Sequence, residues 1–136
     1  MTPTNLAARP ASVFEKLLWI DCIGAAVAGV VVVTFSDWLS RLEGLPQELL
    51  IFTGAVNLLY ASYSFSLAIR DERPMRLVKL LVVANLGWAP VCLVLVLTFS
   101  ATATPFAFVH LVGEAIYVGT LAVFEWRYRE VLLTSV

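Results

Sequence analysis

The chain has 136 residues, of which 60% are hydrophobic and 14% are charged, and its mean hydropathy is +0.89. Soluble domains carry about 25% charged residues, so this composition excludes an ordinary soluble domain and predicts an integral membrane protein in contact with membrane lipid. The net charge of −1 gives no support for a nucleic-acid partner.

The beginning of the chain divides into a leader and a first membrane-crossing helix. Residues 1–12 are polar, and we expect them to form a mobile cytoplasmic leader. A helix is predicted at residues 13–36, because the run from Leu17 to Ser36 has Asp21 as its single charge and can cross about 30 Å of hydrocarbon. The run is long, carries an aspartate and lacks a persuasive small-x-small exit site ahead of Phe35, so we do not expect its removal as a signal peptide.

A patch of small residues lies in the middle of this first helix. Small residues four positions apart let another helix approach closely, either within one chain or between copies in a homo-oligomer. The patch consists of Gly24, Ala25, Ala28 and Gly29. After it, residues 37–42 predict a short helical turn on the outer membrane surface, because their large apolar side chains fall on one side.

The second helix is predicted at residues 47–69. Asn57 and Tyr60 share one of its faces, since three residues make almost one helical turn. The charged turn from Arg70 to Pro74 is expected to be a solvated connector.

Two further helices are predicted at residues 75–100 and 104–127, separated by a tight turn. Thr104 is expected to cap the fourth helix with its side chain, and Pro105 suits the first turn. At the end of the fourth helix, the charges around Glu125 and Arg127 suit the inner interface, and residues 131–136 form a C-terminal tail.

Polar residues interrupt both of these apolar helices. Asn85 and Trp88 share a face of the third helix, and His110, Glu114 and Tyr117 stand at i, i+4 and i+7 on one face of the fourth. A carboxylate at such a position costs on the order of 2.5–3.5 kcal/mol, and it usually faces a bundle interior or a water-filled cavity.

Basic residues predict the orientation of the bundle. All but Arg41 fall at the termini or between the second and third helices, which are the positions of cytoplasmic segments under the positive-inside rule. The predicted fold is therefore an all-α, four-helix, up-down transmembrane bundle with both termini cytoplasmic, in a bacterial inner (plasma) membrane. This topology accounts for the basic residues without nucleic acid.

The two halves of the chain resemble each other. A shift of 64 residues lays Thr34-Phe35-Ser36 on Thr98-Phe99-Ser100 and Asp21 on Asn85. A shift of 57 lays Asn57 on Glu114 and Tyr60 on Tyr117. We interpret the chain as a tandem repeat of one helical hairpin, with a pseudo-twofold axis along the membrane normal, as in some transporter folds.

This arrangement predicts a polar column inside the bundle. Counted from the inner basic residues, Asp21 and Asn85 lie about 8 Å deep, and Asn57 and Glu114 lie about 20 Å deep. The candidate ligand- or proton-binding residues are Glu114, His110, Tyr117, Asp21, Asn85, Asn57, Tyr60 and Trp88.

Three functions fit this column. The first is a non-enzymatic protein that binds a small amphipathic ligand or a proton, with transport as a further step, in which Glu114 is the protonatable site and His110 and Tyr117 are its hydrogen-bond partners. The second is a lipid-modifying isomerase in which Glu114 and Asp21 exchange protons with an apolar substrate. The third is a structural or assembly subunit.

The order of these features resembles a known group of proteins. An aspartate early in the first helix, Asn85-x-x-Trp88 in the third and Glu125-Trp126-Arg127 after the fourth are similar to those of small four-helix bacterial inner-membrane proteins, a largely uncharacterised group, and the architecture is DoxX-like. The resemblance implies a membrane bundle and no catalytic residues. Asn85-x-x-Trp88 and His110-x-x-x-Glu114 also resemble, in reversed order, elements of the sterol-isomerase membrane fold, which would imply proton transfer.

No cofactor or metal site is predicted. His110 and Glu114 have the spacing of ligands on one helix, but one histidine with hard carboxylates at other depths makes a poor zinc or haem site. Cys22 and Cys92 lie at depths that differ by roughly 10 Å, too far apart for a disulfide, so both are expected to be free thiols.

Overall fold

The computed structural model describes residues 16–133, and all of the secondary-structure elements within them are helices, joined by short turns. The predicted leader and residues 13–15 lie outside the described residues. The elements are α2 (Lys16–Thr34), α3 (Ser36–Glu43), α4 (Gln47–Ala68), α5 (Met75–Thr98), α6 (Pro105–Arg127) and the short 3₁₀ helix η1 (Val131–Leu133). By length and composition, α2, α4, α5 and α6 can each cross a membrane, which is compatible with a multi-pass membrane protein.

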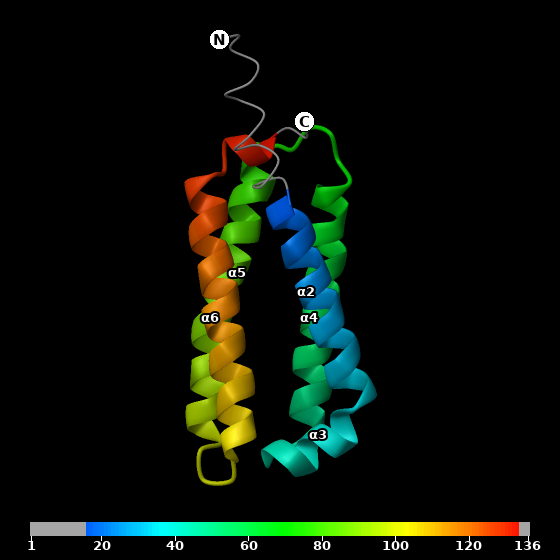
Figure 1. Cartoon of the computed structure of the whole chain (residues 1–136), viewed down its shortest axis with the longest axis vertical. Helices are drawn as coiled ribbons and strands as arrows, with labels where there is room; N and C mark the ends of the chain where they lie inside the picture. The colour runs from blue at the N-terminus through cyan, green and yellow to red at the C-terminus, as the bar shows by residue number, and fades with distance from the viewer. Residues whose placement is uncertain (1–15, 134–136) are drawn as a thin grey trace.

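The four long helices form two hairpins. α2 packs along α4, and α5 packs along α6, whereas the two hairpins approach each other closely at few places (Figure 1). α3 lies at one end of the bundle, which we call the α3 end, and η1 lies at the other, which we call the η1 end. The described helix ends lie within two residues of the predicted ones.

Two glycines bring α2 and α4 into contact. A methyl group added to Gly29 would lie 2.9 Å from the carbonyl oxygen of Gly54, and one added to Gly54 would lie 2.6 Å from a methyl carbon of Val33. Close approach of this kind is how helices pack in a membrane, where lipid offers no hydrophobic drive. Gly29 of the small-residue patch therefore serves packing within the chain, while assembly of copies through the patch stays a prediction.

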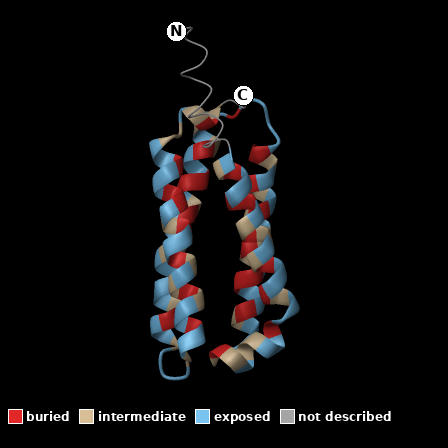
Figure 2. Cartoon of the chain, viewed as in Figure 1, coloured by how far each residue is buried: buried red, intermediate tan, exposed pale blue. Residues whose placement is uncertain are grey.

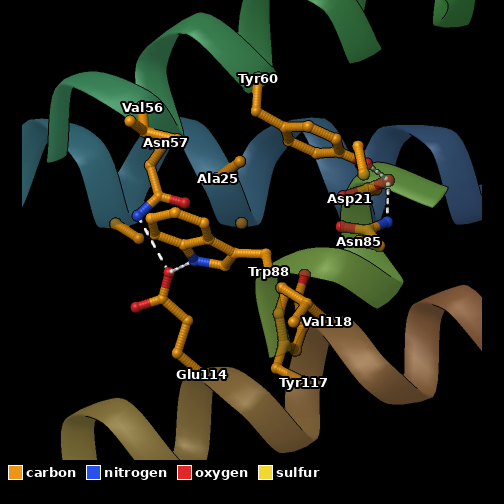
Figure 3. A pocket seen from close by; sticks show the side chains of 13 residues that line it. Asp21, Ala25, Val56, Asn57, Tyr60, Asn85, Trp88, Glu114, Tyr117 and Val118 are labelled. Carbon is orange, nitrogen blue, oxygen red and sulfur yellow. Dashed lines mark hydrogen bonds between the residues drawn. The ribbon is translucent and has the colours of Figure 1, made fainter. Parts of the chain in front are cut away.

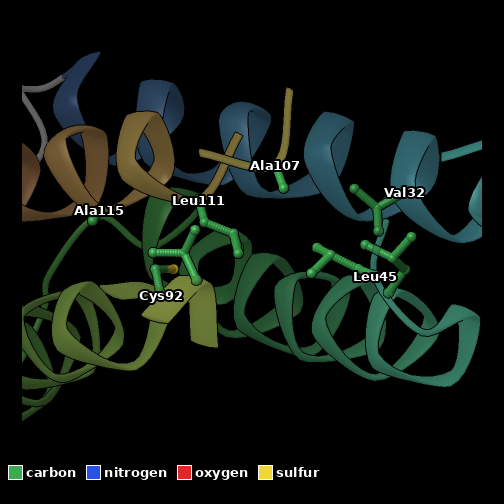
Figure 4. Close-up of a cluster of buried hydrophobic side chains, with 8 residues drawn as sticks. Val32, Leu45, Cys92, Ala107, Leu111 and Ala115 are labelled. Carbon is green, nitrogen blue, oxygen red and sulfur yellow. The ribbon is translucent and has the colours of Figure 1, made fainter. Parts of the chain in front are cut away.

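The buried apolar residues form two separate clusters. One lies toward the α3 end and is shown in Figure 4; it contains Val32, Leu45, Leu50, Cys92, Val96, Ala107, Leu111 and Ala115. The other lies toward the η1 end and contains Leu18, Leu67, Ala68, Val78, Leu81 and Leu132. Large apolar side chains such as Leu59 and Val109 are instead exposed on the outside of the bundle, as Figure 2 shows for most outward positions. Asp21, Asn57 and Asn85 lie between the two apolar clusters along their helices.

Both ends of the bundle differ from expectation in detail. The helical turn predicted at residues 37–42 is confirmed as part of α3, while its position on a membrane surface stays a prediction. The hydroxyl of Thr104 does not cap α6, because it donates instead to the carbonyl of Leu42 at 2.7 Å. The 70–74 turn is not simply solvated. The guanidinium of Arg73 is buried and donates to the carbonyls of Leu67, Ala68 and Leu132, because the last carbonyls of a helix need donors. Part of the predicted tail is thereby packed on the bundle.

The glycine contact predicts a specific stability effect. Replacing Gly29 by alanine should destabilise the protein by about 1–3 kcal/mol, because the methyl group meets the backbone of α4. Gly113→Ala is the matched control, since no neighbouring atom lies within 4 Å of the added methyl group. Thermal unfolding in one detergent measures both. Equal midpoints for the two variants would contradict the close packing of α2 on α4.

Candidate functional site

A pocket of about 120 Å³ lies between the two hairpins (Figure 3). Seven of the eight candidate residues line it: Asp21, Asn57, Tyr60, Asn85, Trp88, Glu114 and Tyr117. All four long helices contribute, and Gly24, Ala25 and Ala28 of the small-residue patch form part of the wall from α2. The eighth candidate, His110, lies beside Glu114 but outside this lining.

Glu114 is held by donors from both hairpins. Its Oε1 atom accepts hydrogen bonds from the indole nitrogen of Trp88 at 2.7 Å and from the side-chain amide of Asn57 at 3.0 Å. The Nε2 atom of His110, one turn away on the same helix, lies 3.4 Å from its other oxygen. Each oxygen of the carboxyl group therefore has at least one polar neighbour at the pocket wall, although hydrocarbon offers none.

A second acid meets the other side of the histidine. The Nδ1 atom of His110 lies 2.8 Å and 3.1 Å from the two carboxyl oxygens of Glu43, the last residue of α3. The side chain of Glu43 is only 5% exposed. We did not predict a role for Glu43, and no spacing in the sequence could have indicated one, because the contact joins residues that are 67 positions apart.

Two further acids meet at the η1 side of the pocket. The amide of Asn85 donates to Asp21 at 3.0 Å and contacts Glu125 at 3.2 Å, and the hydroxyl of Tyr60 donates to the same oxygen of Asp21. Asp21 and Glu125 are 1% and 0% exposed.

The placement of Glu125 corrects our expectation of an interfacial charge. Glu125 follows Glu114 by 11 residues, which is close to three helical turns, so both acids face the bundle interior. The spacing of 11 residues in the sequence could therefore have indicated that Glu125 lies on the same face as Glu114. The neighbouring Trp126 and Arg127 do face outward.

Tyr117 makes a close contact between the two hairpins. Its hydroxyl donates to the backbone carbonyl of Ile20 at 2.9 Å, and its ring lies directly against Gly24. A side chain at Gly24 would overlap the tyrosine hydroxyl, so this glycine is required for α6 to reach α2.

The acids around the pocket have almost no basic partners. Within residues 16–133, no lysine or arginine forms an ion pair with Asp21, Glu114 or Glu125. Lys79 and Arg129, at the η1 end, lie against the ring of Trp126 instead. His110 is thus the one group in this part of the structure that can carry a positive charge beside these acids.

Comparisons with protein-family models, curated proteins and solved structures found no match. The resemblance to small four-helix inner-membrane proteins therefore stays a prediction. In the described residues, no three His, Cys, Asp or Glu side chains are arranged to hold a metal ion. Both cysteines are free and buried, as predicted.

The bridging position of Asn85 predicts its effect on stability. Asn85→Leu removes a donor from two buried carboxyl groups and should destabilise the protein by at least about 2 kcal/mol. Glu125→Gln should have a much smaller effect or stabilise, because it removes one of two neighbouring acids and keeps a polar partner for Asn85. Thermal unfolding in detergent measures both. An unchanged unfolding midpoint in Asn85→Leu would show that the hydrogen bonds of Asn85 contribute nothing to stability.

Proposed function

We propose that this protein is a multi-pass inner-membrane protein that binds protons and a small amphipathic cation in the pocket between its hairpins, and exchanges one for the other during transport. The observation that carries the proposal is a set of three acids at or beside the pocket that have no lysine or arginine partner in residues 16–133. Asp21 and Glu114 line the pocket, Glu125 lies next to Asp21, and Asp21 and Glu125 are fully buried. Ionisable groups inside a membrane are costly and usually mark ion or proton pathways.

The charge around the pocket favours a positive ligand. Asp21 and Glu125 share the amide of Asn85, and two carboxylates so close repel each other, so the pair holds one proton between them. Glu114 provides a second negative charge that His110 partly balances. A protonated amine would offset the remaining charge, and the rings of Trp88 and Tyr60 add the aromatic faces that favour cations.

The size of the pocket favours a small ligand. Drug-sized ligands occupy pockets of roughly 300–1,000 Å³, whereas a cavity of about 150 Å³ accommodates benzene. At about 120 Å³, the pocket suits a molecule of only a few heavy atoms. This volume weighs against the isomerase alternative, since a sterol-like substrate needs several times the space.

Contacts between equivalent positions support the proposed repeat. Asp21 is hydrogen-bonded to Asn85, its equivalent under the shift of 64, and Asn57 is hydrogen-bonded to Glu114, its equivalent under the shift of 57. Residues that touch their own equivalents lie close to a twofold axis. Two similar hairpins around a central site are the arrangement that lets transporters alternate access by rocking one half against the other.

Binding of n-butylamine tests the proposal. With the protein in lipid nanodiscs, titration calorimetry should detect the binding of n-butylamine. The binding heat should also vary with the ionisation enthalpy of the buffer, which shows that a proton is released when the amine binds. Glu114→Gln should weaken binding by about tenfold or more, because a hydrogen bond to a charged group contributes about 1.5–3 kcal/mol.

Two controls accompany this measurement. Butan-1-ol has the same shape without the charge and should bind without proton release. Glu48→Gln removes an exposed acid of α4 and should leave the affinity for n-butylamine unchanged. Equal affinity of the wild type and Glu114→Gln for the amine would refute the proposed role of Glu114.

A further inference from the structure

The contact between Glu43 and His110 is not needed to attach α3 to α6. The backbone amide of Thr104 already donates to the carbonyl of Glu43 at 2.9 Å, and its hydroxyl donates to the carbonyl of Leu42. Gly44 makes the turn after α3, with φ of 70°, so close to Thr102 that a side chain would collide with its carbonyl. These backbone contacts fix the end of α3, yet a titratable pair lies beside them.

The pair lies between the pocket and an open groove. Glu43 and His110 line a groove of about 500 Å³ along α2, α3 and α6. Gly24 and Ala28 line both this groove and the pocket, so only the width of α2 at these small residues separates the two spaces. The carboxyl group of Glu43 therefore lies between the groove at the α3 end of the bundle and the ring of His110.

We propose that Glu43, His110 and Glu114 form a proton relay that connects the α3 end of the bundle to the pocket. The relay rests on the proposed function, because it delivers the proton that Glu114 exchanges. The imidazole is placed as a relay requires, with Nδ1 at 2.8 Å from Glu43 and Nε2 at 3.4 Å from Glu114. The longer distance needs only a small movement to become a hydrogen bond, as is common for proton-transfer groups before they act.

Each transfer moves one proton through the ring. A protonated Glu43 gives its proton to Nδ1 of a neutral His110 that carries hydrogen on Nε2, and an O–H bond is exchanged for an N–H bond. The resulting imidazolium gives its Nε2 proton to Glu114, which becomes a neutral acid. His110 is left as the other neutral tautomer. The first tautomer returns when Nε2 takes up a proton from water in the groove that His110 lines and Nδ1 gives its proton back to Glu43, which is then protonated again.

Few other groups can interfere with this relay. The α2 residues that share the groove with His110 include Ile23, Val27 and Val31, which are apolar. From α5, Trp88 reaches Glu114 and does not titrate. Within residues 16–133, Glu43 and Glu114 are the only charged side chains in contact with the imidazole.

Trp88 provides a direct reporter of the protonation of Glu114. Its indole N–H is bonded to the carboxyl oxygen, so its fluorescence should change when Glu114 gains a proton. The other three tryptophans are exposed and can be replaced by phenylalanine, which leaves Trp88 alone; they are Trp19, Trp38 and Trp126. This single-tryptophan protein in lipid nanodiscs is then subjected to a rapid drop in pH.

Loss of the relay should change the rate and not the amplitude of this signal. Glu43→Gln and His110→Ala should slow the change by about a hundredfold, the lower end of what a positioned proton-transfer group contributes. Added imidazole should restore the rate in His110→Ala, an effect that a purely structural histidine would not give. Glu43→Asp should retain most of the rate, and the exposed acid Glu48, at the same end, can be changed to glutamine without effect.

The outcomes separate the relay from the proposed function. An unchanged rate in Glu43→Gln, or failure of imidazole to rescue His110→Ala, would refute the relay while leaving proton binding at Glu114 intact. A full signal in Glu114→Gln would instead refute the proposed function. If Glu43→Gln does not fold, the rescue of His110→Ala decides the question alone.

Discussion

The structure depends on how buried carboxyl groups find hydrogen-bond donors where lipid offers none. Asn57 on α4 donates to Glu114 on α6, and Asn85 on α5 donates to Asp21 on α2. Each hairpin thus supplies the amide that satisfies an acid of the other. An unsatisfied group in hydrocarbon costs several kcal/mol, so these reciprocal bonds fix how the two hairpins meet.

The contacts within and between the hairpins differ in kind. Within the first hairpin, Gly29 and Gly54 allow tight packing of backbone on backbone, which does not change with protonation. Between the hairpins, the polar contacts around the pocket involve acids whose hydrogen bonds change when they gain a proton. The proposed exchange of a proton for a cation therefore acts at the contact that holds the halves together, which is where a small chemical change can move them.

Sequence patterns predicted the membrane helices and most of the pocket, because both follow from spacing along a single helix. His110, Glu114 and Tyr117 share a face by periodicity alone, and α6 does place them on one side. Periodicity also placed Glu125 on that face, but its position beside Arg127 favoured an interfacial reading that proved wrong. The hydroxyl of Thr104 was predicted to cap its own helix, yet a carbonyl of α3 lies nearer.

By itself, the sequence determined that four helices are long and apolar enough to cross a membrane, and roughly where each begins and ends, since length and hydropathy are read directly from it. Only the tertiary structure decided which polar groups meet. Glu43 is one acid among several in a loop until the turn at Gly44 and the contacts of Thr104 bring α3 against His110. Such contacts depend on how two distant segments pack, and the spacing of residues along a single helix cannot predict that packing.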